Sequence, residues 1–125
     1  MKPQKIILAG ITAALFLTGC YYDKEEIIYP AGSCNSAGST YSGAVSPLLN
    51  LRCNSCHSTT AAPSSGNNIV LDNYNSVKIQ VDNGKLLASL NHAGGVSPMP
   101  KGGSKLSSCE IAKVTNWVGS GAPNN

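Results

Sequence analysis

The sequence predicts a small helical domain, and three features of the chain indicate it. Apolar residues recur at helical spacing near the C-terminus, a shorter apolar run leads into a Cys-x-x-Cys-His motif, and no strand pattern precedes that motif. The chain has 125 residues, of which 42% are hydrophobic and 12% are charged. That length predicts one folded domain and excludes a large enzyme core.

The C-terminal helix carries the strongest local signals. Residues 107–110 fit a capping box, and Leu106 and Ile111 stand where a hydrophobic staple would place them. We expect the helix to end at Gly119 or Gly121. Its apolar residues recur at helical spacing: Ile111, Val114, Trp117 and Val118.

Shorter helices are expected upstream of this one. Ser46 is predicted to be an N-cap with Pro47 at the first helical position, so that a short helix delivers Cys53. Residues 71–79 and 84–90 are further helical candidates, whereas residues 58–68 are predicted to form a long loop rich in Ser, Gly and Asn. The side chains expected to contact the core or a bound cofactor are Tyr74, Val77, Leu86, Leu87 and Leu90.

The start of the chain has the pattern of an export signal. Lys2 and Lys5 precede an apolar run over residues 6–17, and Leu-Thr-Gly-Cys closes it at Cys20. The run is too short to span a bilayer, and the tetrapeptide resembles the bacterial lipobox. We therefore expect a lipoprotein signal peptide over residues 1–19 and a lipid on Cys20.

Localisation and charge follow from that assignment. Residues 20–40 are predicted to be a lipidated N-terminus and flexible tether, because they show no sustained period. The protein is expected to be exported and lipid-anchored, at the outer membrane rather than the inner one, because Tyr21 stands where aspartate marks inner-membrane retention in some bacteria. Removal of the signal peptide leaves a net charge of +1, so the sequence does not have the excess of basic residues that is typical of nucleic-acid-binding proteins.

The segment from Cys53 to His57 is the motif that carries chemistry. The thiols of Cys53 and Cys56 can each add to one vinyl group of haem, and the imidazole of His57 can then lie under the iron, so the spacing is that of c-type haem attachment. The alternatives are a structural zinc site that uses the same three residues and a thioredoxin-like redox pair. Zinc would need a fourth ligand, and His92 is the other histidine in the chain.

Met99 is the candidate for the second axial ligand of a haem. Pro98 and Pro100 hold it in an extended segment, from which its thioether could be aimed at the iron. His92 competes for the same role as a second imidazole.

These features together resemble a small class I, mono-haem cytochrome c domain of the lipoprotein type found in Bacteroidetes-like bacteria. The resemblance covers residues 41–123 and rests on Cys53 to His57, the Met99-Pro100 loop and the capped helix that carries Trp117. It implies an all-α, compact cytochrome c fold over residues 41–125, with the N- and C-terminal helices packed around one covalent haem c. It also implies His57 and Met99 as axial ligands, and one-electron transfer rather than catalysis.

The remaining expectations concern cysteines and partners. Cys34 and Cys109 remain once the lipidated and haem-linked cysteines are set aside, so we expect a disulfide between them in an oxidising compartment. The expected partners are redox donor and acceptor proteins, the membrane and the haem-attachment machinery, and the protein is expected to be a monomer. The functional alternatives are a haem enzyme or gas sensor with a dissociable Met99, and a zinc-binding lipoprotein.

Overall fold

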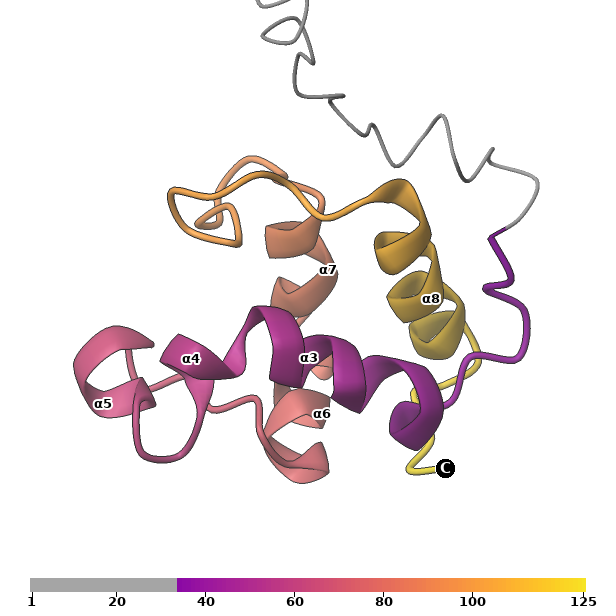
Figure 1. Ribbon diagram of the computed structural model, residues 1–125, viewed down its shortest axis with the longest axis horizontal. Coiled ribbons are helices and arrows are strands. Elements are labelled where there is room, and N and C mark those ends of the chain that lie inside the picture. The colour runs from indigo at the N-terminus through magenta and orange to yellow at the C-terminus, as the bar shows by residue number, and fades with distance from the viewer. Residues whose placement is uncertain (1–33) are drawn as a thin grey trace, which may run out of the picture. The chain divides into compact units, whose positions relative to one another are not determined.

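A computed structural model describes residues 34–125 and is shown in Figure 1. The predicted signal peptide, Cys20 and the part of the predicted tether up to residue 33 lie outside the described residues. Within residues 34–125 the structure is helical and has no strand, which confirms the all-α prediction for this part of the chain. Its elements are the π-helical turn η2 (Tyr41–Val45) and the α-helices α3 (Ser46–Arg52), α4 (Asn54–His57), α5 (Ala62–Ser65), α6 (Tyr74–Asp82), α7 (Lys85–Leu90) and α8 (Ser108–Gly119).

Helical structure begins earlier than the sequence predicted. Ser46 is itself helical, at φ −59° and ψ −45°, so its assignment as an N-cap was wrong. Thr40 caps the segment instead: it is extended, and its hydroxyl accepts a hydrogen bond from the Gly43 N–H at 3.0 Å. η2 then runs directly into α3, and Pro47 is the second residue of α3, directly after the π-helical turn.

The middle helices are shifted from their predicted ranges. α6 begins at Tyr74 rather than residue 71, because the Asn73 side chain accepts the Ser76 N–H at 3.0 Å and so acts as the N-cap. α7 follows Gly84, whose φ of +73° suits glycine. The predicted loop over residues 58–68 contains one helical turn, α5, so it is less irregular than its composition indicated.

The signals predicted for α8 are confirmed. The Ser107 hydroxyl accepts the Glu110 N–H, and the Glu110 carboxylate accepts the Ser107 N–H, which completes the capping box. The helix ends at Gly119, and Gly121 follows at φ +94°. Its inward face buries Val114 and Trp117 completely.

The core lies where η2, α6 and α8 meet. The Trp117 ring is 5.6 Å from the Tyr41 ring, which is in turn 5.1 Å from the Tyr74 ring in an edge-to-face arrangement. The polar atoms of two of these rings are paired with backbone carbonyls, since Trp117 Nε1 donates to Pro123 at 2.9 Å and the Tyr74 hydroxyl donates to Ala122 at 2.8 Å. The other large buried side chains are Val45, Leu49, Leu71, Val77, Leu86, Leu90, Leu106 and Val114.

The two ends of the described chain are tied to this core. Backbone and side-chain oxygens of Asn125 accept the N–H groups of Ser42 and Tyr41, at 2.8 and 2.9 Å respectively. Residues 34–40, which the sequence placed in the tether, belong to the same compact unit as the helices. No helix within residues 34–125 is both long and apolar enough to cross a membrane.

Candidate functional site

The Cys-x-x-Cys-His motif forms a single helical turn at the end of α3. Cys53 departs from helical geometry, at φ −123° and ψ −38°, and separates α3 from α4. Its carbonyl accepts the N–H groups of Cys56 and His57 at 3.0 and 2.9 Å. These two hydrogen bonds close the turn and bring the backbones of Cys53 and Cys56 within one helical turn of each other.

The two thiols have different environments. Cys53 is half-buried and packs against the core, whereas Cys56 is exposed, and neither forms a disulfide with another described residue. Burial is the main reason that the pKa of the Cys53 thiol is raised to about 11; nearby Arg52 lowers it slightly and Glu110 raises it slightly. Cys53 therefore stays a protonated thiol at neutral pH.

His57 has a fixed orientation. Its Nδ1 lies 2.8 Å from the carbonyl oxygen of Ile69, which can only accept, so Nδ1 carries the proton and donates it. In the neutral ring, Nε2 then holds the lone pair. This is the arrangement in which a histidine binds a metal through Nε2 while a backbone carbonyl sets its tautomer and ring angle.

Gly66 allows the chain to close around His57. It is the C-cap of α5 and is buried, and a Cβ built on it would lie 2.4 Å from the Cys56 carbonyl oxygen and 2.9 Å from His57 Nδ1. Real Cβ atoms do not approach backbone so closely, so glycine is required here. Sequence reasoning missed Gly66, although glycine after a helical turn is a known C-cap signal.

The segment after His57 is anchored by a carboxylate. The His57 carbonyl accepts the Leu71 N–H at 2.7 Å, and the next residue, Asp72, accepts both the backbone N–H and the hydroxyl of Thr59. These two hydrogen bonds, the backbone one first, hold the pKa of Asp72 below its usual value. The loop that carries Ile69 is thereby tied back to α4.

Met99 lies in a second cluster with His92. Met99 is half-buried; its N–H donates to the Ser89 carbonyl at 3.1 Å, and its own carbonyl accepts from His92 Nε2 at 2.9 Å. Figure 1 shows this loop, in orange, at the same end of the view as α4 and α5. Within residues 34–125 no hydrogen bond joins this cluster to the turn that holds Cys53, Cys56 and His57.

The cysteines and histidines of the described chain are not assembled as a zinc site. Across residues 34–125, no three or more His, Cys, Asp or Glu side chains are gathered so that they could hold a metal ion. Cys53, Cys56 and His57 would have to rearrange to coordinate zinc together.

Cys34 and Cys109 lie next to each other at the start of α8. Their Sγ atoms are 2.01 Å apart and their Cα atoms 5.6 Å apart, which is disulfide geometry. Asn116 Nδ2 donates to the carbonyl and the hydroxyl of Ser36, at 3.0 and 2.9 Å. The end of the predicted tether therefore follows the outer face of α8.

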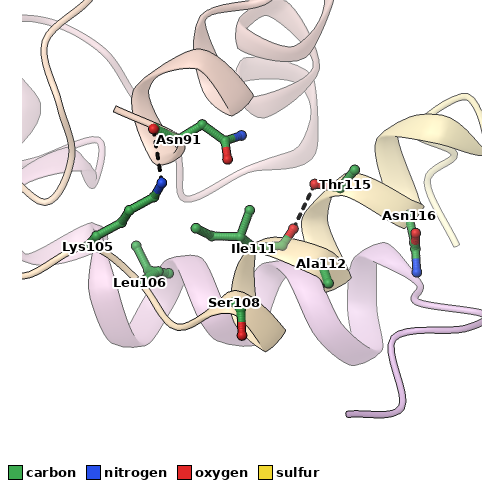
Figure 2. A pocket seen from close by; sticks show the side chains of 8 residues that line it. All are labelled: Asn91, Lys105, Leu106, Ser108, Ile111, Ala112, Thr115 and Asn116. Carbon is green, nitrogen blue, oxygen red and sulfur yellow. Dashed lines mark hydrogen bonds between the residues drawn. The ribbon is translucent and has the colours of Figure 1, made fainter. Parts of the chain in front are cut away.

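A groove of about 500 Å³ lies elsewhere, between α8 and the turn that follows α7 (Figure 2). Lys105 spans one side of it and donates to the Asn91 carbonyl at 3.0 Å, while Ile111 points into it. Its lining residues are Asn91, Lys105, Leu106, Ser108, Ile111, Ala112, Thr115 and Asn116. None of these is a residue for which the sequence predicts a ligand role.

Comparisons with known proteins give no relative for this chain. No protein-family model matches it, and neither a curated protein nor a solved structure shows significant similarity. Function is therefore inferred from the residues and their geometry.

Proposed function

We propose that this protein is a one-electron carrier, a membrane-anchored mono-haem c-type cytochrome. In this proposal the lipid is on Cys20, the thioethers to haem c are on Cys53 and Cys56, and the axial ligands are His57 and Met99. The observation that carries the proposal is the hydrogen bond from His57 Nδ1 to the Ile69 carbonyl, directly after a Cys-x-x-Cys pair.

That hydrogen bond adds geometry to the sequence spacing. The Ile69 carbonyl places the proton of the His57 ring on Nδ1, and Gly66 lets the surrounding chain pack closely against the ring. The result is an Nε2 lone pair with a set direction, which costs little further ordering when a metal binds.

The cysteines suit covalent attachment of a haem. Each thiol would form one carbon–sulfur bond, and its hydrogen would go to the other carbon of the vinyl group, so that no oxidant is consumed. Cys56 is exposed to an incoming vinyl group, and Cys53 lies one turn away, half-buried against the core. A haem so attached supplies an iron that alternates between the ferrous and ferric states.

The chain's own residues would then tune and protect that iron. A methionine thioether from Met99 favours the ferrous state more than a second imidazole would, so it raises the reduction potential. With His57 and Met99 both bound, no coordination position is left for a substrate, which supports electron transfer over enzymatic activity. The partners are then donor and acceptor proteins that approach an exposed haem edge.

The zinc alternative has less support. It needs Cys53, Cys56 and His57 to converge on one ion, and they are not gathered in that way among the described residues. His92, the remaining histidine, already bonds to the Met99 carbonyl through Nε2. No observation within residues 34–125 favours a gas sensor in which Met99 leaves the iron.

The experiment is an absorption spectrum of the full chain matured in a host that has the haem-attachment machinery. We expect a c-type spectrum in the reduced protein, haem that stays with the polypeptide under acidic organic extraction, and the weak far-red band of methionine-ligated ferric haem. Met99→Leu should lose the far-red band and keep the covalent haem. A Cys34→Ser, Cys109→Ser double variant, which alters two cysteines outside the motif, should keep both.

Each alternative has its own outcome. Haem without the far-red band in the unaltered protein would contradict Met99 as a ligand. A colourless protein that contains stoichiometric zinc would replace the proposal with a structural zinc site.

A further inference from the structure

The turn that ends α7 contains a residue that is unusual for its position. Asn91 is the C-cap, and His92 follows in the left-handed region at φ +57°. The N–H of His92 donates to Ser89, and that of Ala93 donates to Ala88, at 3.2 and 2.9 Å. This is the Schellman pattern, whose left-handed position is normally glycine because a Cβ is strained there.

The hydrogen bond that the His92 side chain makes explains why histidine, and not glycine, occupies this left-handed position. Its Nε2 donates to the Met99 carbonyl at 2.9 Å, while the Met99 N–H donates to the Ser89 carbonyl at 3.1 Å. Both backbone polar groups of Met99 are thus bonded to the end of α7. Glycine would cap the helix with less strain, but it could not make the first of these bonds.

The same turn is held from a third direction. Lys105 Nζ donates to the Asn91 carbonyl at 3.0 Å, so the residue before His92 is tied to the segment that leads into α8. Both ends of the loop between His92 and Met99 are therefore hydrogen-bonded to the turn that ends α7. These bonds restrain the loop although it contains two adjacent glycines, Gly94 and Gly95.

We propose that His92 is a positioning residue for Met99. Its hydrogen bond to the Met99 carbonyl, made from the turn that caps α7, fixes the Met99 backbone and so the direction of the Met99 side chain. This inference rests on the proposed function, in which Met99 binds the haem iron. His92 is then not a ligand through Nε2, because that nitrogen is engaged by the Met99 carbonyl.

The test is His92→Gly in the haem-loaded protein. Glycine suits the left-handed position, so the melting temperature should not fall. The hydrogen bond from the His92 side chain to the Met99 carbonyl is lost. Loss of one ordinary hydrogen bond should weaken methionine ligation by about 5-fold. We therefore expect a weaker far-red band, imidazole binding to the ferric protein that is about 5-fold tighter, and faster hydrogen exchange at the Met99 N–H.

Two further variants separate positioning from general effects of the substitution. Asn67→Gly also places glycine at an exposed left-handed residue, φ +52°, and should leave the far-red band and imidazole binding unchanged. His92→Gln keeps a side-chain N–H of similar reach and should restore part of the band.

The outcomes distinguish this inference from the proposed function. Suppose that the unaltered protein has the far-red band. If His92→Gly then has the same band intensity, the same affinity for imidazole and the same hydrogen-exchange rate at the Met99 N–H, the positioning role is refuted and Met99 ligation stands. If the unaltered protein has no such band, Met99 is not a ligand, and the role of His92 falls with it.

Discussion

Arg52 and Glu110 connect the helix that delivers the Cys-x-x-Cys-His turn to the helix that closes the fold. Arg52 Nε lies 3.0 Å from Glu110 Oε1, and the other carboxylate oxygen of Glu110 accepts the backbone N–H and the hydroxyl of Ser107, each at 2.9 Å. One carboxylate thus serves a helix cap and an ion pair at once. Arg52 directly precedes Cys53, so this contact bears on the orientation of the motif.

The first prediction concerns acid stability through Glu110. Partial burial raises its pKa, but the hydrogen bonds from Ser107 and the Arg52 guanidinium outweigh burial, so the net pKa is lowered. Because the pKa of Glu110 is lower in the folded protein than its ordinary value of 4.5, its ionised carboxylate stabilises the fold above pH 4.5. That stabilisation is lost as the pH falls through the pKa that Glu110 has in the folded protein. Glu110→Gln keeps the capping-box geometry without the charge, and it should flatten the decline in melting temperature below that pH.

The matched control for Glu110→Gln is Asp82→Asn. Asp82 forms an exposed ion pair with Lys78 within α6, and such pairs contribute little to stability. Its melting curve should keep the acid dependence of the unaltered protein. A Glu110→Gln variant with the same acid dependence as the unaltered protein would show that Glu110 does not carry it.

The second prediction concerns Gly66. Gly66→Ala would push a Cβ into the Cys56 carbonyl and His57 Nδ1, so the ring or the turn must move. We expect destabilisation of about 1–3 kcal/mol, as for overpacking of a tight interior, together with a lower yield of covalently attached haem. Calorimetry and the ratio of haem to protein absorbance measure these two effects.

Gly119→Ala is the control for that substitution. A Cβ at Gly119 meets nothing within 4 Å, and the residue is the last of α8. Alanine there should be neutral or slightly stabilising, because it favours the helix over the unfolded chain. Equal behaviour of the two alanine variants would contradict the close packing around His57.

The features that could be predicted from sequence are those set by neighbouring residues. The capping box at Ser107 and the periodicity through Trp117 involve residues within a few positions of one another, so the sequence predicts α8 closely. The motif turn is also local. Ser46 was misassigned because the helical path continues back to Thr40, where η2 packs Tyr41 against Trp117, and that contact depends on the far end of the chain.

The hydrogen bonds that orient His57 and Met99 depend on the path of the chain between residues that are distant in the sequence. Ile69 reaches His57 across twelve positions, and His92 reaches Met99 across seven. No composition or period signals either contact. α5 was hidden for another reason: a single helical turn is too short to show a period within a Ser-rich segment.

The third prediction concerns Cys34 and Cys109. Alkylation of the folded protein without reduction should leave both unmodified, and reduction should expose both to the reagent. Their loop spans 75 residues, and on the chain-entropy model a bond that closes it contributes about 4 kcal/mol. Cys34→Ser and Cys109→Ser should each lower the melting temperature by a similar amount, and the double variant should add little, because either change opens the same loop.

The last prediction concerns the dependence of the fold on haem. Twelve hydrophobic residues are buried among residues 34–125, and two of them are alanines, whereas Leu51 and Ile79 are 77% and 61% exposed. A core of this size is marginal for a domain of roughly 90 residues, and a covalent haem would add apolar surface to it. We therefore expect a Cys53→Ala, Cys56→Ala double variant without haem to show weak helical circular dichroism and no cooperative melt, whereas the haem-loaded protein should melt in one cooperative transition. The control is the Cys34→Ser, Cys109→Ser variant loaded with haem, which also lacks two cysteines. It should still melt in one cooperative transition, at a lower temperature because its disulfide is absent. A native-like spectrum with a cooperative melt in the haem-free variant would show that the helices pack stably on their own, and that haem binds a preformed domain.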